Sequence, residues 1–205
     1  MLESYLRPVY QLYIVNPIAK KTSCSPMQLT YLACLSGIFA GLALSFHFYK
    51  LSILFLLFSG FLDTLDGTVA RMENAASAVG TVADIISDRI VELAMLFGLF
   101  AIDPSYRTTA ILVMIGSSYL CVTSFLVVGI FTSNHAQKSF EYSIGLIERF
   151  EAFLFFIAMV IWPQHFNFLA YVFSAFVLIA TYRHVKNFSA SMSEVAIGKQ
   201  SIASI

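Results

Sequence analysis

The chain has 205 residues, of which 59% are hydrophobic and 12% are charged. Soluble domains usually carry about 25% charged residues, so this chain has too little polar surface to cover a water-soluble globule. The formal net charge is zero, which excludes the strongly basic balance that draws proteins to nucleic acid. The composition therefore favours an integral membrane protein and predicts no nucleic-acid partner.

The first 22 residues differ from a secretory signal peptide because charges and prolines interrupt them, at Glu3, Arg7, Pro8 and Pro17. Their apolar residues recur at helix-like spacing, which predicts an amphipathic helix at the membrane interface over residues 1–22. The alternative is an ordinary N-terminal tail. The apolar positions are Leu2, Tyr5, Leu6, Val9, Leu12 and Tyr13.

Six stretches are apolar over about the 20 residues that a helix needs to cross a bilayer. Backbone groups must pair within a segment in hydrocarbon, so each stretch is expected to be helical. The prediction is a single all-α integral membrane domain over residues 1–205, with six transmembrane helices, an N-terminal interfacial helix and a loosely ordered polar tail at 189–205. The expected spans are 29–48, 51–69, 80–101, 108–131, 144–161 and 166–182.

The distribution of Lys and Arg predicts the orientation of these spans. With the N-terminus inside, the outer loops contain only Lys50 and Arg107. The positive-inside rule therefore places both termini in the cytoplasm. The inner segments contain Arg7, Lys20, Lys21, Arg71, Lys138, Arg183, Lys186 and Lys199.

The second and third expected spans carry an unusual number of ionisable residues. Such residues are costly in membrane helices unless they face a cavity, a partner or an ion. Asp63 and Asp66 are three residues apart, and Asp84 and Asp88 are four apart, so each pair shares a helical face. The alternative without a functional site is that these groups simply lie at the water interface. The charged set is Asp63, Asp66, Arg71, Asp84, Asp88, Arg89 and Glu92.

Four carboxylates directed at one point repel one another unless positive charge neutralises them. Mg²⁺ and Mn²⁺ prefer oxygen ligands and would supply that charge. A pair of such ions suits phosphoryl chemistry, because together they can hold the attacking and the leaving oxygen. Gly67 and Gly80 remove side chains where a nucleotide could approach, and Arg71 offers a planar fork for phosphate oxygens.

The stretch from Asp63 to Asp88 fits D-x2-D-G-x2-A-R-x8-G-x3-D-x3-D at every fixed position. It resembles the signature of the CDP-alcohol phosphotransferase family, as does the six-span layout. The resemblance implies that a CDP-linked alcohol, usually CDP-diacylglycerol, donates its phosphoalcohol group to a second alcohol and CMP leaves. It also implies a homodimer, for which the third and fourth spans could provide the interface.

By motif position, the resemblance makes Asp63, Asp66 and Asp84 metal ligands. Asp88 becomes the general base and an additional metal contact. Gly67, Ala70, Arg71 and Gly80 would shape the nucleotide site.

The segment from Ser25 to Thr30 is similar to the family's P-N-x-[LI]-T opening of the first span, with Met27 in place of Asn. This similarity implies that Gln28 and Thr30 contact the nucleotide, as could Ser77. The alternative is a plain helix start, with Ser25 as the cap and Pro26 in the first turn. Both interpretations can hold together.

Three charges open the fifth expected span, at Glu148, Arg149 and Glu151, and similar segments lie near the acceptor pocket in family members. Arg149 could pair with an anionic acceptor, or instead form internal salt bridges. Inositol phosphate, inositol, glycerol 3-phosphate and serine are all plausible acceptors, and Arg149 favours a phosphorylated one.

Two other functions compete with this hypothesis. Carboxylates inside a membrane also mark the pathways of cation channels and transporters. A non-catalytic membrane scaffold is the other alternative, although the complete motif argues against it.

Overall fold

The computed structural model describes residues 10–133 and 149–203, and within these ranges it is helical without strands, as the all-α prediction requires. It begins with the π-helical turn η1 (Gln11–Val15) and continues with α2 (Asn16–Ala19) and α3 (Pro26–Ser45). The remaining elements are α4 (Tyr49–Met72), α5 (Ala78–Ile102), α6 (Pro104–Ser133), α7 (Arg149–Ile161), the 3₁₀ turn η2 (Pro163–His165) and α8 (Phe166–Ala203).

Four of these helices, α3, α4, α6 and α8, are long and apolar enough to cross a membrane. Helix α5 has 25 residues and is also long enough, but four charged side chains interrupt it between Asp84 and Glu92. Helix α7 has 13 residues, and the rest of the predicted fifth span, 144–148, lies outside the described residues. The protein is therefore a multi-pass helical membrane protein, and the count of six spans stays a prediction.

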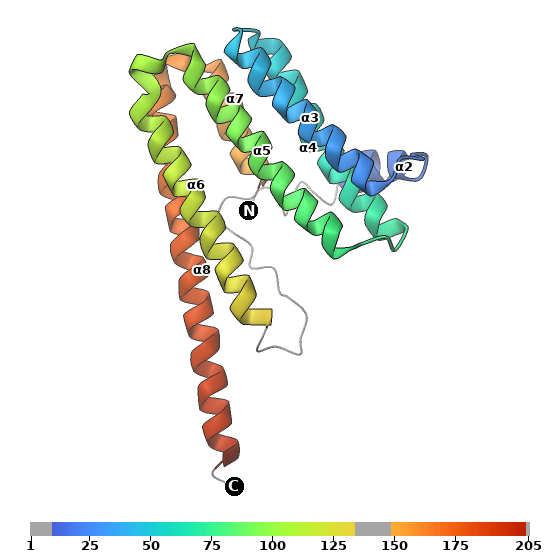
Figure 1. The fold of residues 1–205 in the computed structure, drawn as a ribbon, viewed down its shortest axis with the longest axis vertical. Helices are drawn as coiled ribbons and strands as arrows, with labels where there is room; N and C mark the ends of the chain where they lie inside the picture. The colour runs from blue at the N-terminus through green and yellow to red at the C-terminus, as the bar shows by residue number, and fades with distance from the viewer. Residues whose placement is uncertain (1–9, 134–148, 204–205) are drawn as a thin grey trace.

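Helix α8 extends well beyond the predicted sixth span. It has 38 residues and continues to Ala203 through most of the segment expected to be a loosely ordered tail. The segment contains no proline, so nothing breaks the helical hydrogen-bond ladder once it has begun. Figure 1 shows α8 lying beside α6 and projecting beyond it.

Helix α3 packs against both α4 and α5, and α4 and α5 have no comparable backbone contact with each other in the described structure. Small residues allow the α3–α5 contact to be close. A methyl group added at Gly98 of α5 would lie 2.5 Å from the carbonyl oxygen of Gly41 on α3. The same side of α3 presents Gly37 to Val91. Backbones that approach this closely gain van der Waals contact, which is the main attraction between helices in lipid.

Hydrogen bonds between side chain and backbone join α3 to α4. The Ser36 hydroxyl donates to the carbonyl oxygen of Phe55 at 2.8 Å, and the Ser59 hydroxyl donates to that of Ala33 at 2.7 Å. Ser59 is fully buried and Ser36 nearly so. These bonds cross from one helix to the other in both directions, so they set the register of α3 along α4.

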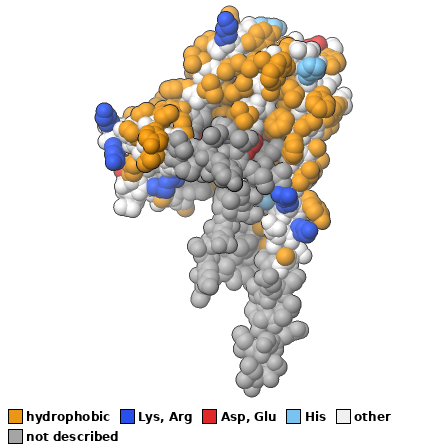
Figure 2. All heavy atoms as spheres, turned by 180° about the vertical axis from the view of Figure 1, so that it is seen from behind, with side chains coloured by type: hydrophobic (Ala, Val, Ile, Leu, Met, Phe, Trp, Pro, Cys, Tyr) orange, Lys and Arg blue, Asp and Glu red, His pale blue; other side chains and the backbone are white. Residues whose placement is uncertain are grey.

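The buried apolar side chains form two clusters. The larger cluster draws on α3 to α8 and includes Leu44, Leu56, Met95 and Phe156. The smaller cluster packs the N-terminal segment against α3 and α4, through Val15, Ala19, Leu29, Leu65 and their neighbours. Large hydrophobic side chains also cover much of the visible outer surface (Figure 2), as expected for contact with lipid.

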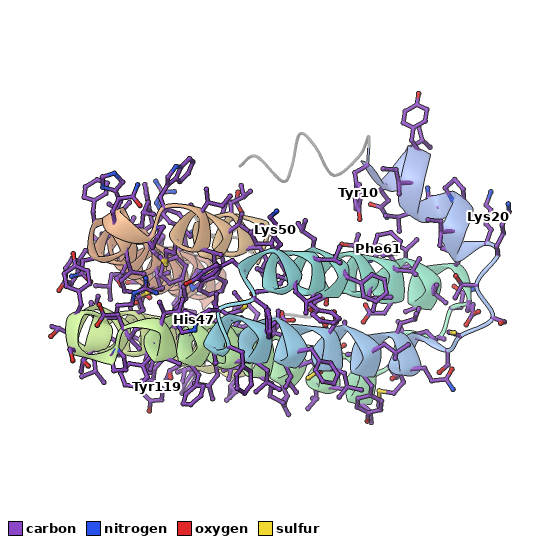
Figure 3. All side chains as sticks on the ribbon, turned by 90° about the horizontal axis from the view of Figure 1, so that it is seen from above. Tyr10, Lys20, His47, Lys50, Phe61 and Tyr119 are labelled. Carbon is purple, nitrogen blue, oxygen red and sulfur yellow. The ribbon has the colours of Figure 1, made fainter. Side chains whose placement is uncertain are left out.

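Cationic side chains lie at both ends of the bundle. Lys20 and Lys50 lie at opposite ends of the α3–α4 pair (Figure 3). Arg107 lies near the Lys50 end, at the start of α6, where it is 3% exposed. Its guanidinium donates to the Leu99 carbonyl oxygen at 2.9 Å and lies 4.3 Å from the centre of the Phe166 ring. Arg107 therefore connects α5, α6 and α8.

We expect Gly98→Ala to lower the free energy of unfolding by about 1–3 kcal/mol, because the added methyl group overpacks the α3–α5 contact. The matched control is Gly116→Ala in α6, where an added methyl group meets nothing within 4 Å. There the change should be neutral or stabilising by about 0.5–1 kcal/mol, because alanine is the better helix former. Unfolding by SDS titration in mixed micelles measures both, and equal losses in the two variants would contradict the close α3–α5 contact.

Candidate active site

The turn between α4 and α5 is short and capped at both sides. Asn74 adopts a left-handed backbone with φ of 52°, a conformation that Asn tolerates after a helix end. The Ala75 amide donates to the Ala70 carbonyl oxygen at 2.9 Å, which closes α4. The Ser77 hydroxyl accepts a hydrogen bond from the Gly80 amide at 3.0 Å, which opens α5. These caps occupy the eight-residue gap of the sequence motif, so its two halves lie on adjacent antiparallel helices.

Asp63, Asp66 and Asp84 converge between α4 and α5. One carboxylate oxygen from each lies within 4.8 Å of the other two. Asp66 precedes the end of α4 by six residues and Asp84 follows the start of α5 by six. Both therefore lie about 9 Å from the same end of the bundle, given the helical rise per residue. Sequence spacing predicted that four aspartates would point at one place, and the structure brings together three of them, without Asp88.

The three carboxylates fit a divalent cation site. Asp66 is 6% exposed, while Asp63 and Asp84 are half-buried. Three acidic oxygens at this separation repel one another when ionised, and a hard cation with oxygen ligands offsets that repulsion. The donor set is all carboxylate, which suits Mg²⁺ or Mn²⁺ better than softer metals.

Thr30 of α3 holds Asp66 in place. Its hydroxyl donates to Asp66 Oδ2 at 2.6 Å, and the contact is buried. The same hydroxyl lies 3.1 Å from the Pro26 carbonyl oxygen, but it has one proton, and the shorter contact with a carboxylate is the stronger one. The sequence predicted Thr30 as a nucleotide contact and missed this role, because the two residues are 36 positions apart and no local pattern connects them.

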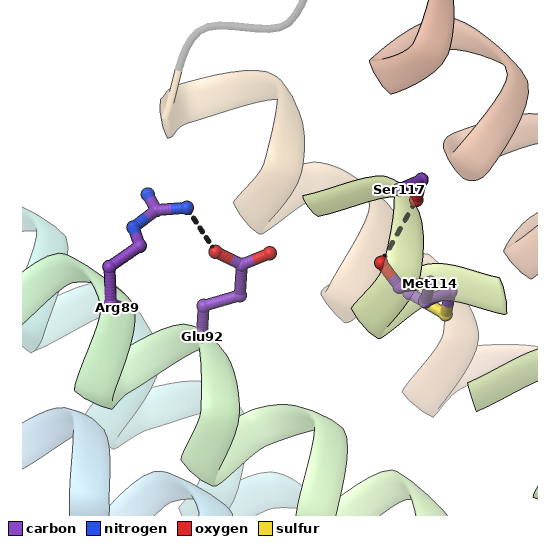
Figure 4. Close-up of polar contacts among 4 residues, drawn as sticks. All are labelled: Arg89, Glu92, Met114 and Ser117. Atoms are coloured by element: carbon purple, nitrogen blue, oxygen red, sulfur yellow. Dashed lines mark hydrogen bonds and ion pairs between the residues drawn. The ribbon is translucent and has the colours of Figure 1, made fainter. Parts of the chain in front are cut away.

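Asp88 follows Asp84 by one helical turn on the same face of α5, where it is half-buried. It lies outside the group of three carboxylates that share a point. Its neighbour Arg89 forms an ion pair with Glu92 along α5 (Figure 4). The spacing of three residues between opposite charges was the signal for this pair, which the sequence left unassigned.

Arg71 bends back along α4 over Gly67. Its Nη2 donates to the Thr68 hydroxyl at 3.2 Å, and a methyl group added at Gly67 would lie 3.4 Å from its Nη1. The Arg71 side chain is exposed, and Ala70 beside it is half-buried. The predicted nucleotide-site residues of α4 thus follow the carboxylates toward the helix end.

The other predicted nucleotide contacts act as helix caps. The Ser25 hydroxyl accepts from the Gln28 amide at 3.3 Å, and the Gln28 side-chain oxygen accepts from the Ser25 amide at 3.0 Å. Pro26 begins α3, so the interpretation as a helix start is confirmed. Ser77 caps α5 in the same way. Contact of Gln28, Ser77 and Gly80 with a nucleotide stays a prediction.

The acceptor side is described less fully. Arg149 is the first residue of α7, but its side chain and the whole of Glu148 lie outside the described residues. Between α6 and α8, one polar contact escaped sequence reasoning: Ser124 Oγ of α6 and His184 Nδ1 of α8 are 3.4 Å apart. No spacing rule connects positions so distant in the chain.

Comparison with known proteins decides the family. A family model for CDP-alcohol phosphatidyltransferases matches residues 24–183. The chain belongs to this family. It is therefore a membrane-embedded member of a transferase family of phospholipid synthesis, as the sequence motif predicted.

The chain is similar to several individual proteins of known sequence or structure. A phosphatidylinositol phosphate synthase of Corynebacterium glutamicum is 32% identical over 143 residues, which span 66% of this chain and 64% of the synthase. Inner membrane protein YnjF of Escherichia coli is 27% identical over 90% of this chain and 94% of its own length. The fold resembles that of the Mycobacterium tuberculosis phosphatidylinositol phosphate synthase PgsA1, solved with CDP-DAG bound. That match has a TM-score of 0.70 at 20% identity, over 85% of this chain and 93% of the other.

We expect Thr30→Val to weaken divalent-metal binding about 10- to 100-fold, the usual effect of removing a hydrogen bond to a metal ligand. Valine keeps the shape but leaves Asp66 Oδ2 without its donor, whereas Thr30→Ser keeps a hydroxyl and should bind nearly as wild type. Isothermal titration of purified protein with Mn²⁺ measures the affinity directly. Equal affinities for the valine and serine variants would show that the hydroxyl does not hold Asp66 for a metal.

Proposed function

We propose that this protein transfers the phosphatidyl group of CDP-diacylglycerol to a hydroxyl of a small polar alcohol and releases CMP. The observation that carries the proposal is the meeting of Asp63, Asp66 and Asp84 within 4.8 Å inside the family motif. The choice of donor is supported by the related fold of PgsA1, whose structure contains CDP-DAG.

Mg²⁺ or Mn²⁺ is the proposed cofactor, with two ions held by Asp63, Asp66, Asp84 and, at the edge, Asp88. When bound, the cations offset charge on the diphosphate and on the departing CMP. Thr30 orients one Asp66 oxygen and leaves the other available as a ligand.

Asp88 is the proposed general base. It takes the proton of the acceptor hydroxyl while that oxygen attacks the phosphorus that bears the lipid. The bond between this phosphorus and the bridging diphosphate oxygen breaks, and the electrons leave with CMP. Its place supports this role, because Asp88 lies one turn further into the bundle than Asp84 and outside the three-carboxylate group.

The nucleotide is proposed to lie over the ends of α3, α4 and α5. Gly67 and Gly80 leave room for it there. Arg71 carries the positive charge nearest the cluster on α4 and is proposed to reach phosphate, because its side chain is exposed and its one described hydrogen bond, to Thr68, lies on the same helix. The proposed contacts are Gly67, Ala70, Arg71, Ser77, Gly80, Gln28 and Thr30.

The acceptor is proposed to be a phosphorylated polyol such as inositol phosphate, with Arg149 pairing with its phosphate. The C. glutamicum relative, named phosphatidylinositol phosphate synthase, supports this choice over inositol or glycerol 3-phosphate. The active site is proposed to face the cytoplasm with both termini. The homodimer also stays a proposal, supported by a stripe of exposed apolar side chains on α5 at Val82, Ile86, Ile90, Leu93 and Phe97.

We expect the reconstituted protein to release CMP from CDP-diacylglycerol only with Mg²⁺ or Mn²⁺ and fastest with a phosphorylated acceptor. Asp66→Asn should lower the rate at least about 100-fold, because it removes charge where the metals are held. The matched control is Asp103→Asn at the far end of α5, where asparagine can still cap α6 and the rate should be unchanged.

Labelled CMP and labelled lipid product are counted with inositol phosphate, inositol, glycerol 3-phosphate and serine as acceptors. If the protein is reconstituted in lipid vesicles, cation flux into them without CMP release would instead support a channel or transporter. Reaction of uncharged alcohols alone would contradict the phosphorylated acceptor while leaving the transferase reaction intact.

Asp88→Asn should lower kcat by about 100- to 10,000-fold, the usual contribution of a general base. The affinity for CDP-diacylglycerol should stay near the wild-type value, because the three remaining aspartates still form the metal site. Single-turnover rates and direct binding of CDP, both at saturating Mn²⁺, separate the two effects. Near-normal turnover in this variant would rule out Asp88 as the base.

A further inference from the structure

The N-terminal segment of residues 10–22 has two apolar faces. Its inner face packs Val15 and Ala19, which are 0% and 6% exposed, against α3 and α4. Its outer face exposes four large hydrophobic side chains. They take no part in the packing of the inner face against α3 and α4. These are Leu12 at 60%, Tyr13 at 73%, Ile14 at 47% and Ile18 at 40%.

Two lysines end this segment beside a shallow pocket. Lys20 and Lys21 are exposed, and with Leu12, Asn16 and Pro17 they line a cavity of about 370 Å³. Residues 10–22 contain no acidic side chain, so the segment itself carries a net positive charge. Figure 3 shows Lys20 at the end of the segment. On the left of Figure 2, the side on which α2 lies, lysine and arginine side chains are seen beside hydrophobic ones.

The start of α3 indicates that the segment lies near the level of a bilayer surface. Helix α3, a candidate membrane span, begins at Pro26, only five residues after Lys21. Lysines and tyrosines at the ends of membrane helices usually lie at the headgroup level, and basic residues there attract anionic lipids.

We propose that residues 10–22 form a binding site for the headgroup of an anionic phospholipid. Lys20 and Lys21 bind the lipid phosphate at the pocket, while Leu12, Tyr13, Ile14 and Ile18 enter the boundary between headgroups and acyl chains. A second copy of this chain fits the surface less well, because the paired lysines of two copies would meet with like charge and no acid in either segment to offset it.

Such a lipid would act close to the active site without being the substrate. Val15 and Ala19 belong to the same apolar cluster as Leu29 and Leu65, the residues immediately before Thr30 and Asp66. A bound lipid would thus press the segment onto the two helical turns that position Asp66. The inference goes beyond the proposed reaction and does not depend on the identity of the acceptor.

The test is native mass spectrometry of the full chain titrated with phosphatidylglycerol or phosphatidylcholine. Divalent cations are left out so that the proposed diphosphate site is not loaded. Wild type should bind phosphatidylglycerol more tightly. The double change Lys20→Gln, Lys21→Gln should weaken that binding roughly 25-fold, at about a five-fold loss for each basic residue. Lys20→Arg, Lys21→Arg should keep it, as should Lys50→Gln at the opposite end of the bundle.

Equal binding of the two lipids by wild type, or unchanged binding by the double glutamine variant, would overturn the proposal. Full competition by soluble glycerol phosphate would also overturn it, because the site would then be one for free phosphate. A second measurement avoids dependence on the folding of the lysine variants. Tyr13→Trp in a Trp162→Phe background should be quenched by phosphatidylglycerol brominated on its acyl chains, and a lack of quenching would contradict lipid contact.

Discussion

The close contact of α3 with α5 sets the position of everything that surrounds the aspartates. At Gly41 and Gly98 the two backbones leave no space for a methyl group, so α5 can neither slide nor rotate on α3 without a clash. Helix α4 is held against α3 by the hydroxyl bonds of Ser36 and Ser59. Because α3 fixes both partners, α4 and α5 can face each other across carboxylates that would otherwise drive them apart.

Repulsion among those carboxylates explains why the site needs such a support. No stabilising interaction joins the ionised carboxylates of Asp63, Asp66 and Asp84 to one another. Packing elsewhere and a cation must therefore hold them together. Thr30 connects the supporting helix α3 to the carboxylate cluster, since it belongs to α3 and donates a hydrogen bond to Asp66. The capped turn at Asn74 and Ser77 completes the arrangement by bringing the two halves of the motif to the same depth. A metal-dependent phosphotransfer site is the function that best accounts for this arrangement.

The N-terminal segment would add a second support for the site, from the membrane surface. Its inner face rests on the turns before Thr30 and Asp66, and its outer face carries apolar side chains and two lysines. Lipid contact on one side and helix contact on the other would make the bilayer surface part of the mechanical support of the site. An enzyme with the proposed lipid donor would have reason to couple its active site to that surface.

The sequence alone indicated the family, the helical class and the aspartates of the candidate site, because these follow from composition, from the signature motif and from spacings along each of two helices. The i, i+3 and i, i+4 rules fix which residues share a face, and the caps at Ser25 and Ser77 are local. The tertiary structure decided the rest. The partnership of Thr30 with Asp66, the contact of Ser124 with His184 and the apposition of Gly41 and Gly98 join residues 36, 60 and 57 positions apart. The length of α8 was also decided there, because the expected tail is polar yet contains no proline that would end a helix. Local patterns constrain only neighbours along the chain, and these contacts depend on how whole helices pack.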